Sequence, residues 1–198
     1  MIPALRNKIL DRRRGMSESE TAQLSSKVCR HFIEVSDRVL GQDYWAAKKV
    51  GLYRTQHSVI PGEVDPSSLE KILMSQKGVL SFPRIINRES KAMEFAQASQ
   101  DSNWTLGPYG LHEPAESQQA TLPQDLDVIF VPGVAYGRSG ERIGMGVGFY
   151  DRYLQNVKKA LRISLAFDFQ IYDQLEQNPW DQRVHWIIGE TEEIRHAS

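Results

Sequence analysis

The chain has 198 residues, 40% of them hydrophobic and 25% charged, which suits one globular domain with a sizeable buried core. Its 24 Lys and Arg nearly balance 25 Asp and Glu, and the net charge of −1 argues against a protein that works by neutralising a nucleic-acid backbone. The single cysteine, Cys29, excludes a disulfide framework and a cysteine-based zinc site, and the lack of an apolar run of roughly 20 residues leads us to expect a soluble, cytoplasmic protein without a membrane partner.

The first 14 residues predict a short, basic amphipathic helix and lack the apolar core of a signal peptide. Ile2, Leu5 and Ile9 recur at helical spacing, and five of the other residues are Lys or Arg. Gly15 ends this helix. We interpret the arginine run at positions 12 to 14 as a solvated face rather than as a nucleic-acid patch, because short charge runs on helices are usually exposed.

A second helix is predicted to begin after Ser17, which stands three residues before Glu20 in the spacing of a capping box, and to end near Gly41. Apolar runs at 49–53 and 79–83 then predict two strands that flank a helix closed by Gly78. Together they form one β-α-β unit.

The second half of the chain continues this alternation. Residues 97–124 are rich in Gln, Ser, Pro and Gly without a period, so we expect a long loop that faces a ligand. The apolar run 126–131 predicts a strand covered on both faces, residues 149–159 a helix, and residues 163–167 and 185–188 two more strands. Strands separated by helices indicate a single-domain α/β fold with a largely parallel sheet flanked by helices.

The glycine-rich segment 140–148 is the most informative part of the sequence. Gly144, Gly146 and Gly148 alternate just before a predicted helix, an arrangement that suits phosphate oxygens because glycine lets backbone N–H groups approach a ligand closely. It is not a dinucleotide fingerprint, since Phe149 stands where the last glycine would be, and the chain has no Walker A sequence.

Two interpretations of this segment stay open from the residues alone. The glycines could simply form a tight turn that packs a helix onto the sheet. Asp151 could bind a magnesium ion beside bound phosphates, or it could be a carboxylate favoured by the helix dipole.

The whole pattern from Gly140 to Arg152, which reads Gly-x-Arg-Ile-Gly-x-Gly-x-Gly-Phe-Tyr-Asp-Arg, resembles the 5-formyltetrahydrofolate cyclo-ligase family, also called 5,10-methenyltetrahydrofolate synthetase. The resemblance extends over nearly the whole chain. It includes the segments 14–17, 62–65, 82–84, 110–114 and 127–132.

This resemblance implies one cyclo-ligase domain over residues 1–198 with the sugar-phosphate isomerase/CoA-transferase-like fold, in which the basic helix 1–15 contributes to the nucleotide site. It implies a ligase of one-carbon metabolism that converts 5-formyltetrahydrofolate and ATP to 5,10-methenyltetrahydrofolate, ADP and phosphate. The formyl oxygen takes the γ-phosphoryl group and ring closure follows. Mg²⁺ accompanies ATP, and the protein is expected to be a monomer or weak homodimer.

The resemblance also assigns residues. The expected catalytic residues are Arg142 and Asp151, and the expected metal ligands are Asp151 and Asp181. Glu63 would hydrogen-bond the pterin between aromatic walls formed by Tyr109 and Phe149. The expected ATP-binding residues are Ile2, Pro3, Ala4, Leu5, Arg6, Arg142, Ile143, Gly144, Met145, Gly146, Val147, Gly148, Phe149 and Tyr150. The expected folate-binding residues are Arg54, Glu63, Tyr109, Met145, Gly146, Val147, Gly148 and Phe149.

The chain departs from the family in two places. Met145 and Val147 stand where some members have basic residues, and Gly137 replaces a common acidic residue. The reaction itself suits the sequence, because phosphoryl transfer needs positioning and charge neutralisation more than a protein nucleophile.

The remaining residues indicate no other kind of catalytic or metal site. We predict Cys29 to be a structural thiol within a helix, find no metal-binding pattern among the five histidines, and assign no role to the tryptophans. Two other functions stay open: a sensor module that binds a sugar phosphate or nucleotide without turnover, and, ranked last, a sugar-phosphate isomerase, for which no paired base is evident.

Overall fold

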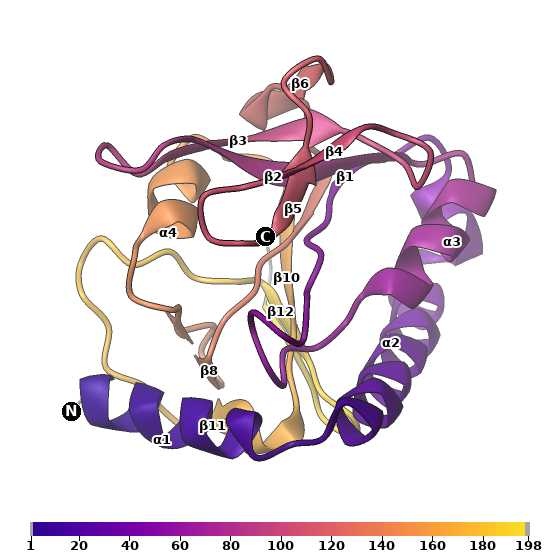
Figure 1. Cartoon of the computed structure of the whole chain (residues 1–198). Coiled ribbons are helices and arrows are strands. Elements are labelled where there is room, and N and C mark those ends of the chain that lie inside the picture. Colours follow the sequence, from indigo (N-terminus) through magenta and orange to yellow (C-terminus); the bar gives the residue numbers. More distant parts are fainter. Residues whose placement is uncertain (1, 197–198) are drawn as a thin grey trace.

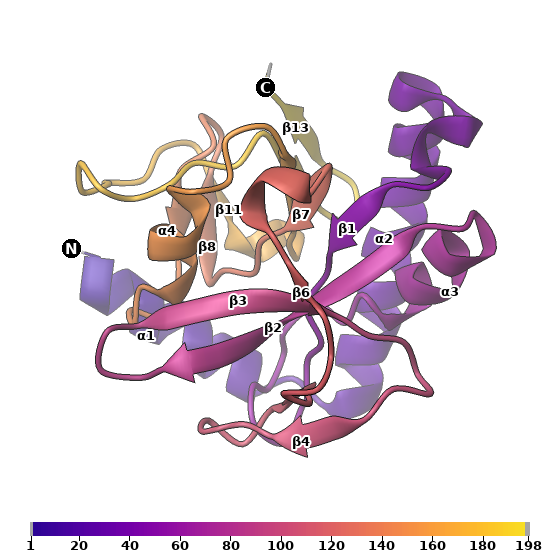
Figure 2. The ribbon, with the colours of Figure 1, turned by 90° about the horizontal axis from the view of Figure 1, so that it is seen from above.

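An eight-stranded mixed sheet forms the centre of the fold in the computed structural model, which describes residues 2–196 (Figures 1 and 2). The strand order is β13-β12-β10-β7-β1-β2-β3-β6. These strands are β1 (Lys49–Gly51), β2 (Val79–Asn87), β3 (Ala92–Gln97), β6 (Ala120–Thr121), β7 (Val128–Phe130), β10 (Leu161–Leu165), β12 (Trp186–Ile188) and β13 (Glu193–Arg195).

The five central strands, from β12 to β2, run parallel, whereas β13, β3 and β6 pair antiparallel at the edges. The predicted single-domain α/β fold is therefore confirmed, and the sheet is parallel only in its centre. The predicted β-α-β unit is also confirmed, because β1 and β2 pair in parallel around α3 (Ser67–Ser75).

The other helices lie around this sheet: α1 (Ile2–Arg14), α2 (Glu18–Leu40) and α4 (Phe149–Leu154), with 3₁₀ turns η1 (Gln42–Trp45), η2 (Pro123–Asp125) and η3 (Asp168–Gln170). In Figure 1, α2 and α3 stand along one side, α4 lies on the other, and α1 runs along the base beneath β8 and β11. The Ser17 side chain accepts from the Glu20 N–H, as the predicted capping sequence requires. None of the helices in residues 2–196 is long and apolar enough to cross a membrane.

Two small sheets were not predicted. β8 (Ala135–Gly137), β9 (Arg142–Ile143) and β11 (Ile171–Tyr172) form one, and β4 (Trp104–Leu106) and β5 (His112–Pro114) form a hairpin. The prediction of a long loop without regular structure at 97–124 is therefore wrong, since β4, β5 and β6 lie within it. These strands have only two or three residues, too few to produce a readable alternation.

Helix α4 ends at Leu154, five residues before the predicted end at Lys159. The Arg162 guanidinium explains the early end, because its Nη2 donates to the carbonyls of Leu154 and Val157 at 2.9 and 2.7 Å. The last carbonyl groups of a helix have no N–H partner within it and need another donor. Here the Arg162 side chain supplies that donor, so the helix can end.

The core lies on both faces of the sheet. Val128 and Phe130 of β7 pack with α2, whereas Ile129 points to the opposite face and packs with α4. All three are fully buried, so the predicted strand covered on both faces is confirmed. Cys29 lies in the α2 side of the core, and burial raises its pKa to about 11, as expected for a structural thiol.

Replacing Phe130 should measure how much this core contributes. Phe130 packs edge-to-face on Phe32, with ring centroids 5.2 Å apart. We expect Phe130→Ala to lower the free energy of unfolding by about 3–5 kcal/mol, measured by urea denaturation. Leu106→Ala, at a side chain that is 69% exposed, is the control and should change it by less than about 0.5 kcal/mol. Equal small effects would mean that β7 is not the central strand of the core.

Candidate active site

A cleft of about 870 Å³ opens at the carboxyl ends of the central parallel strands. Residues 53–54, which follow β1, and residues 132–133, which follow β7, line its floor. The glycine segment, the start of α1 and the β2-β3 hairpin contribute the walls. Open α/β sheets place ligand sites at this edge of the sheet.

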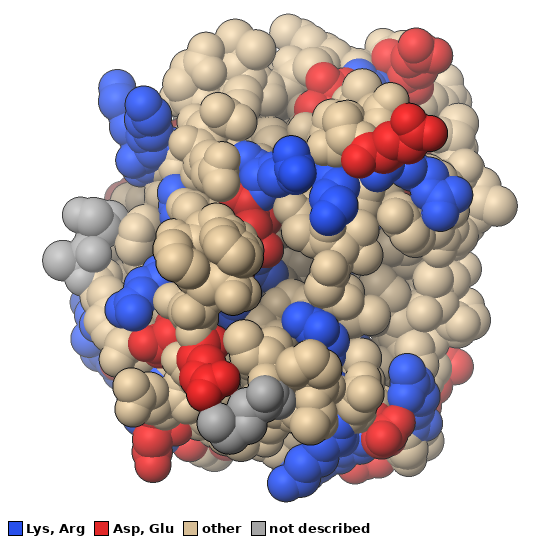
Figure 3. Space-filling model, turned by 90° about the vertical axis from the view of Figure 1, so that its left-hand side faces the viewer, with Lys and Arg blue, Asp and Glu red and all other residues tan. Residues whose placement is uncertain are grey.

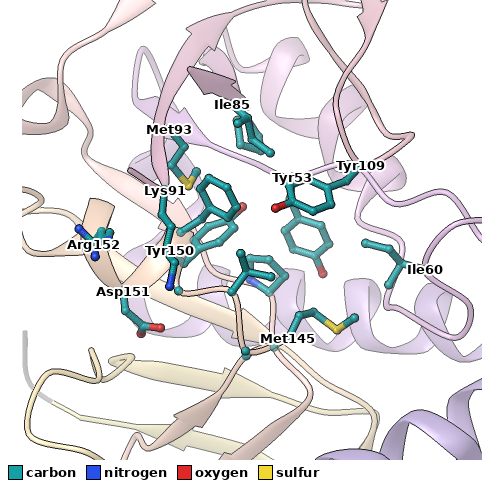
Figure 4. Close-up of a pocket in the computed structure, with 18 of the residues that line it drawn as sticks. Tyr53, Ile60, Ile85, Lys91, Met93, Tyr109, Met145, Tyr150, Asp151 and Arg152 are labelled. Carbon is teal, nitrogen blue, oxygen red and sulfur yellow. The ribbon is translucent and has the colours of Figure 1, made fainter. Parts of the chain in front are cut away.

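Charged and apolar side chains both line the cleft. Figure 4 shows Lys91, Asp151 and Arg152 on one side, and Ile60 and Met145 on the other. Figure 3 shows the face of the molecule on which α4 and the start of α1 lie, where Lys and Arg side chains gather around a hollow with acidic groups between some of them. Such a cleft suits a ligand that has both anionic and flat apolar parts.

The start of α1 holds the glycine segment in place. Arg6 Nε donates to the Gly144 carbonyl at 2.9 Å, and the Arg6 guanidinium packs against Gly146, where a Cβ would lie 3.2 Å from Nη1. Gly146 has a φ of +95°, a backbone conformation that glycine adopts readily because it has no Cβ. Gly148, with a φ of +87°, then leads directly into α4.

Arg142 and Asp151 form an ion pair at the base of this segment. Arg142 Nη2 donates to Asp151 Oδ1 at 2.5 Å, and its Nη1 donates to the Pro132 carbonyl at 3.1 Å. The Arg142 side chain is 2% exposed and that of Asp151 22%, so the carboxylate is the member of the pair that faces the cleft.

A second acidic residue lies close to this pair. The backbone N–H of Gln182 donates to Asp151 Oδ1 at 3.3 Å, which brings the neighbouring Asp181 to the same edge of the cleft. The Asp181 carboxylate accepts from the backbone and side chain of Asn178. The two carboxylates are thus gathered from distant parts of the sequence.

Glu63 is buried in the wall of the cleft. Its Oε1 lies 3.7 Å from Arg13 Nη2. Burial raises the pKa of Glu63, and the positive charge of Arg13 opposes that rise. The Tyr53 hydroxyl donates to the carbonyl of Val64 at 2.9 Å and so anchors the backbone directly after Glu63.

The interpretation of the arginines at 12 to 14 as a solvated face is wrong for Arg13. Arg13 is only 1% exposed, because the loop 60–63 folds over it and its Nε donates to the Pro61 carbonyl at 3.2 Å. Arg14 is exposed, and Arg12 lies 3.9 Å from the ring centroid of Phe169. A charge run on a helix of 3.6 residues per turn points in several directions, so its members need not share an environment.

Arg54 lies in the cleft but is already engaged. Its Nε and Nη2 donate to the two carboxylate oxygens of the buried Glu70 at 2.9 and 2.8 Å. Its guanidinium also stacks on Trp104, 3.8 Å from the ring centroid. Arg54 therefore presents a fixed, flat surface, and Trp104 gains a place at the site that its sequence position did not reveal.

The two residues expected as aromatic walls lie against each other. The rings of Tyr109 and Phe149 have centroids 5.8 Å apart at an angle of 82°. Tyr109 comes from the turn between β4 and β5, so the segment 97–124 does border the cleft. Part of that segment is regular, but its position agrees with a ligand-facing role.

Most of the residues expected at the site line one cleft: Ile2, Arg6, Arg54, Glu63, Tyr109, the segment 142–151 and Asp181. Pro3, Ala4 and Leu5 do not line it; Leu5 packs into the small core beneath α1. Sequence reasoning missed Tyr53, Lys91 and Glu113 as lining residues. Glu113 lies within the segment 110–114 that carries part of the family resemblance, so that segment was the signal available for it.

The substitution at Gly137 has a local explanation. A Cβ at Gly137 would lie 2.3 Å from Glu141 Oε2, because the Glu141 side chain folds back over that position. Glu141 is buried and pairs with Arg183 at 3.4 Å. This chain therefore supplies a carboxylate beside position 137 from Glu141.

Comparison with known proteins gives a consistent result. The model of the 5-formyltetrahydrofolate cyclo-ligase family matches residues 2–190. The 5-formyltetrahydrofolate cyclo-ligase of Haemophilus influenzae is 28% identical over 187 residues, which cover 93% of this chain and 95% of the relative. The mouse (Mus musculus) enzyme of the same name is 25% identical over 201 residues and covers 94% of this chain and 92% of its own length.

Solved structures agree with this match. The NMR structure of Aquifex aeolicus 5,10-methenyltetrahydrofolate synthetase is 31% identical, with a TM-score of 0.80, and the match covers 99% of this chain and 93% of that chain. The Mycoplasma pneumoniae 5,10-methenyltetrahydrofolate synthetase is 23% identical with a TM-score of 0.72 over 95% of this chain and 98% of that chain, a likeness of fold.

Gly62 should be required for the position of Glu63. Gly62 has a φ of +62°, and a Cβ there would lie 2.6 Å from the Arg13 carbonyl oxygen. Gly62→Ala should lower the free energy of unfolding by at least about 1–2 kcal/mol, the cost of a side chain in the left-handed region. Gly15→Ala, where a Cβ has ordinary contacts and φ is not positive, should be neutral or slightly stabilising. Equal stability of the two variants by thermal melting would contradict this loop geometry.

Proposed function

Because the chain belongs to the 5-formyltetrahydrofolate cyclo-ligase family, we propose that its cleft binds ATP and 5-formyltetrahydrofolate side by side, with the glycine segment between them. The chain is an ATP-dependent ligase of one-carbon metabolism, a 5-formyltetrahydrofolate cyclo-ligase. The observation that carries the proposal is the convergence of the glycine segment, Arg6, Glu63 and the two acidic residues on one cleft.

The nucleotide side consists of the start of α1 and the glycine segment. Ile2, Arg6 and the segment Arg142 to Tyr150 are its proposed ATP-binding residues, and Pro3 to Leu5 form the helical turn that connects Ile2 to Arg6. The N–H groups of a glycine loop can approach phosphate oxygens closely, and Arg6 lies against the loop without an acidic partner among residues 2–196. Met145 and Val147 add no charge, so the positive charge at this loop comes from Arg6 and Arg142.

A magnesium site fits the residues of the cleft. Mg²⁺ usually binds one or two carboxylates together with phosphate oxygens, and Asp151 and Asp181 supply two carboxylates at one edge. No cluster of three or more potential ligands occurs in residues 2–196, which suits an ion that the nucleotide phosphates help to hold. When bound, Mg²⁺ would neutralise charge on the phosphates.

The folate side shares the glycine segment with the nucleotide side. Glu63 is proposed to accept hydrogen bonds from the pterin, and the Tyr109 and Phe149 rings to flank its flat surface. Arg54 and the residues Met145 to Phe149 complete this side. A buried carboxylate and an edge-to-face pair of aromatic rings in one cleft match a flat heterocycle that carries N–H donors.

With the two substrates bound side by side in this way, the reaction has two steps. The formyl oxygen forms a bond to the γ-phosphorus as the bond to ADP breaks, and nitrogen 10 then attacks the activated carbon, expels phosphate and loses its proton. Arg142 and Arg6 stabilise the charge that develops on the transferred group. No protein nucleophile is required, and Cys29 lies in the core away from the cleft.

The rest of the proposal concerns the whole molecule. We infer one domain over residues 1–198 in which the helix 1–15 belongs to the nucleotide site, with the sugar-phosphate isomerase/CoA-transferase-like fold. We also infer a cytoplasmic monomer or weak homodimer. Elution at a single monomer mass over a range of protein concentrations would reject the dimer.

The activity test is a spectrophotometric assay of the purified chain with 5-formyltetrahydrofolate, ATP and Mg²⁺. We expect methenyl absorbance to grow only when all three are present. Growth without Mg²⁺ would reject the metal proposal. If no product forms while ATP or a sugar phosphate still raises the melting temperature, the chain is a binding module without turnover.

Asp151→Asn should separate the two roles of this carboxylate. Asn still offers Arg142 an oxygen acceptor but lacks the charge that a metal requires, so we expect turnover to fall roughly 100-fold with a smaller change in melting temperature than in Asp151→Ala. The Mg²⁺ concentration for half-maximal rate should also rise. Asp101→Asn, in an exposed loop, is the control. Full turnover in Asp151→Asn would reduce Asp151 to a partner for Arg142.

A further inference from the structure

Helix α1 contacts both halves of the cleft. Arg6 donates to the carbonyl of Gly144, and Arg13 pairs with Glu63. Seven residues make about two helical turns, or roughly 10 Å, so the two arginines lie on nearly the same face of α1. Ile9, between them in sequence, is buried and fixes the helix in the small core beneath it.

Arg13 is enclosed on all sides by the loop that carries Glu63 and by the turn after β7. Its Nε donates to the Pro61 carbonyl and its Nη1 to the Gly133 carbonyl, at 3.2 and 3.5 Å. Its Nη2 points to Glu63, 3.7 Å away, and has no hydrogen-bond partner among residues 2–196. A cation that is 1% exposed and held this way has a fixed position.

The long ion pair leaves Glu63 available to a ligand. A bidentate pair such as Arg54 with Glu70 uses both carboxylate oxygens, at 2.9 and 2.8 Å. At 3.7 Å, Arg13 offsets the charge of Glu63 without using its lone pairs. The carboxylate can thus stay ionised in a buried position and still accept hydrogen bonds from a heterocycle.

The other groups around Glu63 do not replace this charge. Asp65 lies in the same loop and raises the pKa of Glu63, an effect opposite to that of Arg13. Thr55 and the tyrosines 53, 136 and 150 also lie near it, on the loop after β1, on β8 and on α4. The three tyrosines are neutral, because burial raises their pKa values well above the ordinary value.

We propose that Arg13 is a positioning residue for folate binding: it holds the Glu63 carboxylate ionised and aimed into the cleft, and α1 thereby joins the pterin side of the site to the nucleotide side. This inference rests on the proposed binding of the pterin by Glu63. Arg13 touches neither substrate; it acts through Glu63.

Steady-state kinetics of the full chain test this role with Arg13→Met, Arg13→Lys and, as matched control, Arg14→Met at an exposed neighbour. We expect Arg13→Met to raise KM for 5-formyltetrahydrofolate by roughly 10- to 100-fold, the usual effect of losing a hydrogen bond to a charged group, because the pterin would lose its bond to an ionised Glu63. KM for ATP should stay largely unchanged. Arg13→Lys keeps the charge and should restore part of the loss. Arg14→Met should match the wild type.

The pH profile adds a readout that a purely structural role would not move. Because Arg13 lowers the pKa of Glu63, its removal should raise that pKa, so the acidic limb of kcat/KM for 5-formyltetrahydrofolate should shift to higher pH in Arg13→Met and stay near the wild-type position in Arg13→Lys. An unshifted limb and an unchanged KM in a variant that melts earlier would overturn the proposal.

A double-mutant cycle with Glu63→Gln keeps the test decisive. If Arg13 acts through Glu63, Arg13→Met should change KM far less in the Glu63→Gln background than in the wild type. Full additivity would overturn the proposal. If Arg13→Met does not fold, Arg13→Lys takes its place in the cycle. If the wild type itself forms no product, the proposed function fails instead. If the wild type is active and Glu63→Gln leaves KM for 5-formyltetrahydrofolate unchanged, Glu63 is not the pterin ligand.

Discussion

The cleft depends on how the backbone is satisfied where the central strand β7 leaves the sheet. Carbonyl groups that are buried at the end of a strand need hydrogen-bond donors, because an unpaired buried backbone group is costly. Ser164 donates to the Val131 carbonyl, Arg142 to that of Pro132 and Gln170 to that of Val134, at 2.6, 3.1 and 2.8 Å. Arg13 reaches the Gly133 carbonyl at 3.5 Å. Two of these four donors are arginines, so the same contacts that end β7 also set positive charge beneath the cleft.

Each of these buried arginines is matched by an acid that faces the cleft. Asp151 pairs with Arg142, and Glu63 pairs with Arg13. Arg54 and Glu70 reverse the arrangement, since the acid is buried and the arginine is the member exposed to the cleft. Burying a charge is costly unless it is paired, so the pairs let the fold keep charged groups at the site. The near-zero net charge of the chain conceals this local order.

The sequence was sufficient where a signal is local or repeated. The capped helix 18–40, the strand of β7 and the glycine segment all carry periodic or glycine patterns that need no partner to be recognised. The missed features depend on distant partners instead. Arg13 is buried only because the loop 60–63 folds over it, α4 stops early because Arg162 caps it, and β4 and β5 exist because two short runs meet across a turn. Assigning residues to the site needed the resemblance to a family, since Glu63 and Asp181 carry no pattern of their own.

The contact between α1 and the glycine segment also bears on how the molecule assembles. Arg6 and Gly144 are 138 residues apart, so α1 leaves the ribosome long before its partner exists. Contacts of such separation form late, because a long loop must close before they contribute. Helix α1, which is synthesised before the other elements in residues 2–196, is therefore among the last of them to dock. The sheet and its core can form before the cleft is complete, and a chain stalled at that stage would be folded but would lack the wall that joins its two binding sides.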